Sequence, residues 1–187
     1  AKVGTVSIYS PNNGYVQAAE AEIYNNSLWF AEGYSLLKLG IGGGQELRIG
    51  KTIGSGYGYT AGSNNGEFNN ARGLGIGPNG TVYVADGNNQ RIQVYSQSGS
   101  FQRTINIGSY VADVAADNNH IYVAAYSTVK KYTTNGAFVT EWPADSAYKI
   151  KIRTTTGTIM TSEAHPTVTN AGILREYSTT GTLLNSI

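Results

Sequence analysis

The chain has 187 residues, a charged fraction of 13% and a formal net charge of +1, so clustered Lys and Arg for nucleic acid or an anionic membrane are not expected. It contains no cysteine, which excludes disulfides, a thiolate nucleophile and a Cys-ligated zinc site. No apolar run reaches the about 18 residues of a membrane span. Its 24 Gly and 14 Tyr, with apolar residues in alternation, favour a β-rich protein.

Five eleven-residue windows, each ending in glycine, recur along the chain. They cover residues 4–14, 34–44, 89–99, 126–136 and 171–181. In the last three, a tyrosine stands four residues before the final glycine (Tyr95, Tyr132 and Tyr177), and the second has Gly40 there. A tight hairpin with positive φ takes glycine at the least strain, so each window predicts a third strand and the turn to a fourth.

Inner hairpins precede the last four windows and supply the first two strands of each sheet. They lie at residues 19–31, 72–85, 111–124 and 147–162. A Gly-, Asn-, Ser- and Tyr-rich insert at residues 54–70 has no period and is predicted to be a loop. The windows start 30, 55, 37 and 45 residues apart, close on average to the about 40–45 residues of a four-stranded repeat.

The stretch at residues 71–105 carries the clearest repeat. It reads LGI at 74–76, PNG at 78–80, VYVAD at 82–86 and NQRI at 89–92. These elements stand in the order and spacing of the NHL repeat, which is named for an Asn-His-Leu signature, with Gln90 in place of the histidine. The stretch resembles that repeat. The resemblance implies a β-propeller, usually of six blades, in which Asp86, Asn89 and Arg91 tie a turn to its neighbouring segment.

We therefore predict an all-β fold, a β-propeller of four-stranded antiparallel blades. Its parts are an outer half-blade at residues 1–18, blades at 19–53, 71–107, 108–144 and 145–187, and the loop insert at 54–70. About four and a half blades do not close a ring. We expect either a fragment of a five- or six-bladed propeller or a ring that another chain completes, with self-association as one possibility.

Two rows of side chains are predicted to face a central channel when the inner hairpins are aligned on their turns. One row is Glu20, Gly73, Asp113 and Lys149, and the other is Glu22, Gly75, Ala115 and Lys151. The two glycines are expected to leave room for a polar ligand or a cation. The alternative is that these charges compensate one another in a wet tunnel, because an unpaired buried charge is costly.

Tyrosines provide the second candidate surface. Tyr57 and Tyr59 lie in the insert, and Tyr110 and Tyr148 stand where blades begin. A flat apolar ring with a hydroxyl suits carbohydrate and protein recognition.

Catalytic signatures are weak. His120 and His165 are expected at opposite ends of blades, which argues against a zinc site. No Gly-x-Ser-x-Gly elbow is present, and the glycine-rich residues 40–44 fall at a hairpin turn rather than before a phosphate-binding helix.

The prediction is a non-catalytic recognition scaffold outside the cytoplasm, without a cofactor, that binds a protein or a carbohydrate through loops on one face. Its predicted ligand-binding residues are Tyr57, Tyr59, Tyr110, Tyr148, Glu20, Asp113 and Lys149. The alternative is a metal-dependent hydrolase or lyase that holds calcium with Glu20, Glu22 and Asp113 and has Glu32 and Glu163 at the rim.

Overall fold

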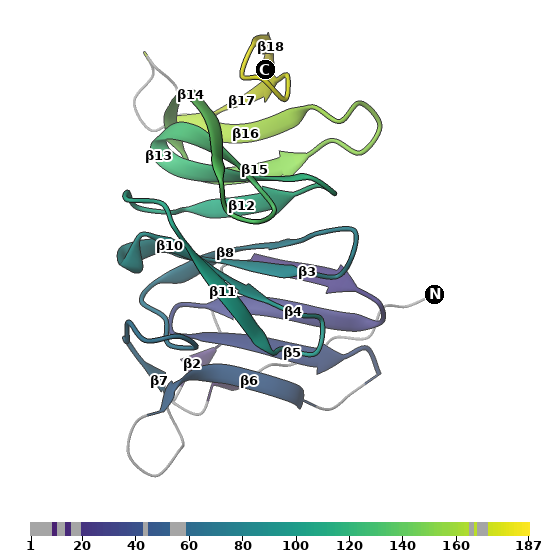
Figure 1. The fold of residues 1–187 in the computed structure, drawn as a ribbon, viewed down its shortest axis with the longest axis vertical. Coiled ribbons are helices and arrows are strands. Elements are labelled where there is room, and N and C mark those ends of the chain that lie inside the picture. The colour runs from purple at the N-terminus through teal and green to yellow at the C-terminus, as the bar shows by residue number, and fades with distance from the viewer. Residues whose placement is uncertain are drawn as a thin grey trace.

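A computed structural model describes residues 9–10, 14–15, 20–42, 45–52, 59–164, 167 and 172–187, with the backbone alone at 9–10, 14–15 and 45–46. Four antiparallel sheets follow one another in chain order along the long axis (Figure 1). The predicted half-blade at residues 1–18 is described only as the short pair β1 (Tyr9–Ser10) and β2 (Gly14–Tyr15).

Each sheet is a meander of neighbouring strands. The first holds β3 (Glu20–Tyr24), β4 (Ser27–Glu32), β5 (Ser35–Gly40), β6 (Gln45–Thr52) and β7 (Tyr59–Thr60), and the second holds β8 (Ala71–Ile76), β9 (Val82–Asp86), β10 (Arg91–Tyr95) and β11 (Phe101–Asn106). The third holds β12 (Asp113–Ala116), β13 (His120–Thr133) and β14 (Phe138–Ala147), and the fourth holds β15 (Lys149–Ile152), β16 (Ile159–Ala164), β17 (Gly172–Tyr177) and β18 (Leu183–Ser186). A single 3-10 turn, η1 (Gly87–Asn89), joins β9 to β10.

Like the second and fourth sheets, the third sheet has four strand segments, because β13 folds back on itself. Fully extended, its 14 residues would span about 45 Å. Instead, the amide of Thr134, just after the strand, donates to the carbonyl of Asn119, just before it, at 3.0 Å. The reversal falls at Tyr126, whose φ is 61°.

The strand register repeats from sheet to sheet and corrects one predicted window. A β-bulge precedes Tyr95, Tyr132 and Tyr177 in their pairing with the outer strand. In the first sheet the same bulge precedes Leu39. Leu39 is therefore the counterpart of the three tyrosines, and the alignment on Gly40 is wrong by one residue. The aligned glycines hid this, because the sequence 40–44 holds four of them.

The core lies in three seams, where consecutive sheets pack face to face. The first seam joins Trp29 and Leu36 to Leu74 and Val84, and the other two repeat this arrangement further along the chain. Turn glycines complete each seam: a Cβ at Gly136 would lie 3.0 Å from Ile105, and one at Gly181 would lie 2.7 Å from Trp142. Both glycines have positive φ, 94° and 91°, so the turn needs glycine for its conformation as well as for its close approach.

Two element bounds differ from expectation. The insert predicted to be a loop contains β7, which pairs with the end of β6 through Lys51 and Thr60. The third sheet runs to Ala147, three residues beyond the predicted limit at 144, because β14 continues its pairing as far as Tyr126 and Ala147.

Candidate functional site: one loop face and the channel mouth

One end of the four sheets gathers the predicted site residues that the structure describes, and we call its loops and turns the loop face. It consists of the connections between sheets and the turns between second and third strands: 33–34, 59–70, 87–90, 107–112, 126 and 148. The antiparallel register places them at one end, since Glu20 pairs with Ala31 and Lys149 pairs with Ser162.

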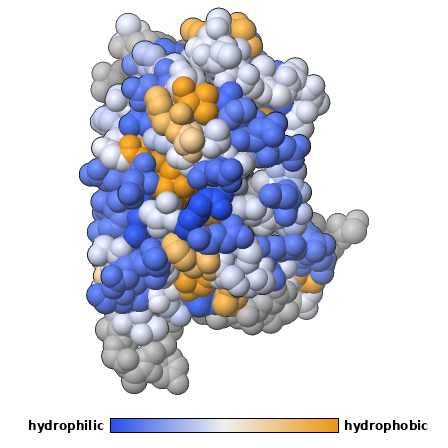
Figure 2. Space-filling view, in the orientation of Figure 1, coloured by the Kyte–Doolittle hydropathy of each residue, from blue (hydrophilic) through white to orange (hydrophobic). Residues whose placement is uncertain are grey.

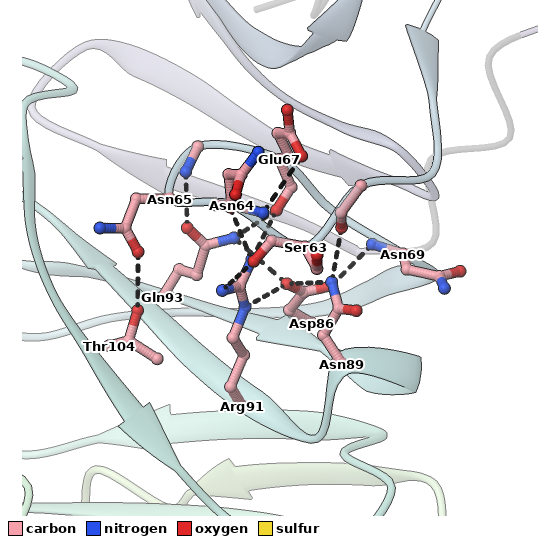
Figure 3. Close-up of polar contacts among 12 residues, drawn as sticks. Ser63, Asn64, Asn65, Glu67, Asn69, Asp86, Asn89, Arg91, Gln93 and Thr104 are labelled. Carbon is pink, nitrogen blue, oxygen red and sulfur yellow. Dashed lines mark hydrogen bonds and ion pairs between the residues drawn. The ribbon is translucent and has the colours of Figure 1, made fainter.

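Arg91 and Asp86 fasten the described part of the insert to this face (Figure 3). Arg91 Nε donates to Asp86 Oδ2 at 2.7 Å, and its two terminal nitrogens donate to the carbonyls of Ser63, Asn64 and Glu67 at 2.7–2.9 Å. Both side chains are buried. The role implied by the NHL resemblance is therefore present here, and it extends to a ten-residue loop rather than to a single turn.

The side-chain amides of Asn89 and Gln93 complete this set of hydrogen bonds, which we call the loop mount. Asn89 Nδ2 donates to the Gly62 carbonyl at 2.7 Å and to Asp86 Oδ2 at 2.9 Å. Gln93 donates to the Glu67 carbonyl at 2.6 Å and accepts from the Gly66 amide at 2.9 Å. Sequence reasoning did not single out Gln93. The available signal in the sequence was a polar side chain between the apolar Ile92 and Val94, and the structure shows that the whole strand is buried.

Glu163 has the same register position as Asp86 and makes a comparable cluster in the fourth sheet. Its Oε2 accepts from Arg175 Nη1 at 2.5 Å and from the Asp145 amide at 2.7 Å. Its Oε1 accepts from the hydroxyl of Tyr177 at 2.8 Å. Burial, with this hydrogen bond to Glu163, raises the pKa of Tyr177 to about 12, so the hydroxyl remains a donor. Glu163 is therefore a buried acceptor that joins neighbouring strands, and it does not lie at the exposed rim where the metal-binding alternative places it.

At the channel mouth, charges from the first and last sheets meet. Lys149 pairs with Glu20, and Lys151 pairs with Glu22 and with Glu20, the last at 2.8 Å. Burial alone would raise the pKa of Glu20, but hydrogen bonds from the two lysines hold it below its usual range. Lys149 and Glu20 are 129 residues apart in sequence, as are Lys151 and Glu22, and the structure brings these two pairs together as the predicted rows require.

Asp113 lies beside these Glu–Lys ion pairs and is fully buried. Its carboxylate accepts from its neighbour Val114 N at 2.9 Å and from Ile150 N of the next sheet at 3.0 Å. Burial raises its pKa to about 7, against the opposing attraction of Lys149. Asp113 therefore links two inner strands and changes charge near neutral pH.

The room expected at Gly73 and Gly75 is filled. A Cβ at Gly73 would lie 2.6 Å from Asp113 Oδ1, and one at Gly75 would lie 2.5 Å from the Val114 carbonyl. These glycines let the backbone of β12 approach β8, so the expectation of open channel space beside them is wrong.

The tyrosines also gather on the loop face. Tyr148 is 56% exposed, and Tyr59 and Tyr110 are partly exposed. Tyr57 lies outside the described residues. Tyr126, which the sequence also places beside a loop, is 54% exposed. Sequence reasoning missed one further exposed tyrosine, Tyr34, at 44%. Its position at the turn between second and third strands was the available signal.

Metal chemistry has little geometric support among the described residues, which contain no group of three or more His, Cys, Asp and Glu arranged to hold an ion. His120 lies at the start of β13 near Asp117, whereas His165 is outside the described residues. Across the described part of the chain, no helix is long and apolar enough to cross a membrane.

Sequence comparison matches residues 68–95 to the NHL repeat family model. Tripartite motif-containing protein 2 of Bos taurus and that of Homo sapiens are each 44% identical over 43 residues, which is 23% of this chain and 6% of the relative. The chain thus spans a small part of these curated relatives.

Solved structures share the fold over most of the chain. Virginiamycin B lyase from Staphylococcus aureus, solved as a catalytically inactive variant with quinupristin, has a TM-score of 0.68 at 16% identity over 95% of this chain and 57% of its own. The Pan2 WD40 domain of Neurospora crassa has a TM-score of 0.65 at 12% identity over 91% and 51%.

The chain folds as a β-propeller, and its residues 68–95 match the NHL repeat. It spans about half the length of these solved propellers. The propeller is built of repeated sheets, and the loop face is where it presents its loops.

Proposed function

We propose that this NHL-repeat propeller is a non-catalytic recognition scaffold that binds a protein partner through its loop face, outside the cytoplasm. The observation that carries the proposal is the exposure of Tyr34, Tyr126 and Tyr148 at this one end of the sheets. Exposed aromatic rings are costly on a surface without a partner, and tyrosine is enriched at protein interfaces.

Preorganisation supports the same proposal. The loop at residues 61–70 is held by side chains from β9, η1 and β10, while Ser63, Asn64 and Asn65 stay exposed. A loop fixed before binding loses less conformational entropy when a partner docks. WD40 neighbours, whose fold this chain shares, also fit a scaffold role.

The test compares two triple variants in capture from the native source followed by mass spectrometry. The loop-face variant is Tyr34→Ala, Tyr126→Ala and Tyr148→Ala, and the control is Phe101→Ala, Phe138→Ala and Leu183→Ala on the outer strands, where exposure is similar. A partner retained by the wild type and the control but lost by the loop-face variant supports the proposal. Equal loss from both variants contradicts it, and a glycan array identifies a carbohydrate partner instead.

The hydrolase or lyase alternative remains a prediction, supported by one observation: the pKa of about 7 at buried Asp113. Against it, Lys149 and Lys151 already pair with Glu20 and Glu22. Calorimetry with calcium chloride tests it directly. Binding heat that disappears in Asp113→Asn would favour this alternative over the scaffold.

A further inference from the structure

Each seam between sheets uses the same four strand positions. The earlier sheet supplies a cross-strand pair from its third and fourth strands, and the later sheet supplies two residues from its first strand. In the second seam these are Ile92 and Ile105, packed with Val114 and Ala116. The register equivalents are Leu36 and Ile49 with Leu74 and Ile76 in the first seam, and Val129 and Trp142 with Ile150 and Ile152 in the third.

The last sheet repeats the first half of this arrangement, and none of the described residues forms a seam with it. Leu174 and Ile187 form the same cross-strand pair, joined by two backbone hydrogen bonds of 3.0 and 2.8 Å. They are 46% and 75% exposed, whereas Ile92 and Ile105 are 0% and 4% exposed. Figure 2 shows hydrophobic surface over β18 at this end of the molecule. We call this the back face.

The first sheet exposes the complementary half. Ala21 and Ile23 have the register positions of Val114 and Ala116 on the innermost strand. Ile23 is 67% exposed and Ala21 is also exposed, although Leu74, Val114 and Ile150 at the position of Ala21 are fully buried. We call this the front face.

We propose that the back face of one molecule docks on the front face of a second copy of this chain, forming a fourth seam of the same design. The second copy is the partner because it carries the matching front-face positions, and three seams within the chain show that these positions pack together. Solved propellers about twice as long as this chain leave room around the axis for the sheets of a second copy. This association is separate from partner binding at the loop face.

Sedimentation velocity over a concentration series tests the seam on the full chain. The two face variants are Ile187→Asp and Ile23→Asp, and Phe138→Asp is the control because it is 57% exposed on an outer strand but has no seam position. Wild type and control are expected to associate. Each face variant should need at least about tenfold higher concentration, since a carboxylate then meets an apolar face.

Mixing the variants distinguishes head-to-tail docking from a symmetric contact. The intact back face of Ile23→Asp fits the intact front face of Ile187→Asp, so the mixture should associate where neither variant does alone. A wild type that stays monomeric at all concentrations overturns the proposal. Association that survives both substitutions, or that Ile23→Asp leaves unchanged, also overturns it. Circular dichroism confirms that each variant is folded, and Leu174→Asp repeats the back-face test.

Discussion

Tyr126 combines an unfavourable backbone with an exposed aromatic side chain. Its φ of 61° lies in the left-handed region, which costs a non-glycine residue roughly 1–2 kcal/mol. The tight reversal inside β13 imposes this conformation, and the position holds a tyrosine although glycine would adopt the conformation without strain. Strained residues of this kind gather at functional sites, which agrees with a binding role for the loop face.

Tyr126→Gly should therefore stabilise the protein. We expect the free energy of unfolding to rise by up to about 1 kcal/mol, because relief of strain exceeds the extra chain entropy of glycine. Urea denaturation followed by circular dichroism measures this. Tyr34→Gly is the control, since Tyr34 is outside the residues with positive φ, and it should not stabilise. A destabilised Tyr126→Gly would contradict the strain argument.

Asp113 should make stability depend on pH. Its pKa is raised in the folded state to about 7, so between about pH 4 and 7 the folded protein holds a proton that the unfolded chain has released. This contribution is complete below about pH 4 and is lost as the pH rises through 7. The free energy of unfolding should fall by up to about 1.4 kcal/mol per pH unit in that interval.

Urea titrations at pH 5, 6, 7 and 8 measure that slope. Asp113→Asn should flatten it, although Lys149 and Glu20 remain nearby. His120→Gln is the control, because His120 lies near Asp117 and has no contact with Asp113 among those described, and the slope should persist in it. A slope that survives in Asp113→Asn would show that another group is responsible.

At the level of elements, the loop mount joins the 61–70 loop to β9 and β10 through several buried hydrogen bonds. Arg91 reaches three loop carbonyls and Asp86, and breaking a buried pair of this kind costs about 3–5 kcal/mol. Its planar guanidinium presents five N–H donors in a fixed fork, a geometry that the three donors of a lysine ammonium do not reproduce. The loop's order thus depends on side chains of strands that follow it in sequence.

Arg91→Lys should loosen this loop specifically. Hydrogen exchange measured by mass spectrometry should show faster exchange in peptides covering 59–70, with little change in β14. Arg153→Lys is the control, because Arg153 pairs with Glu176 while its own side chain is 55% exposed, and exposed pairs contribute less than about 1 kcal/mol. Unchanged exchange at 59–70 would mean that the mount does not order the loop.

For the whole molecule, the position of a sheet sets how well it is covered. The second and third sheets are packed on both faces, whereas the fourth has one seam and a back face with Leu174 and Ile187 exposed. In repeat proteins stability is roughly a sum of repeat and neighbour terms. The fourth sheet should therefore open locally at a lower free energy than the two inner sheets.

Native-state hydrogen exchange at low protein concentration measures this difference. Amides of β17 should exchange faster than those of β10, and the gap should narrow at high concentration if a second copy covers the back face. Equal protection of β10 and β17 at low concentration would contradict the ordering.

Much of the fold and part of the site were predictable from local rules. In an antiparallel hairpin, the number of residues from the turn determines which face of the sheet a side chain lies on. The equivalence predicted in this way is present in the structure, where one register position is shared by Glu20, Gly73, Asp113 and Lys149. Counting failed at the second window, because its consecutive glycines did not fix the alignment with the other windows. There a bulge placed Leu39, not Gly40, opposite the outer strand.

The sequence by itself determined the repeated sheets, since turn glycines, alternation and period are local properties of the chain. Only the tertiary structure decided what occupies each position: β12 fills the space at Gly73, Arg91 binds the carbonyls of a loop some 25 residues away, and Lys149 of the last sheet pairs with Glu20 of the first. Those contacts depend on how close the sheets come together, and that distance is set by the packing of whole faces rather than by any one residue.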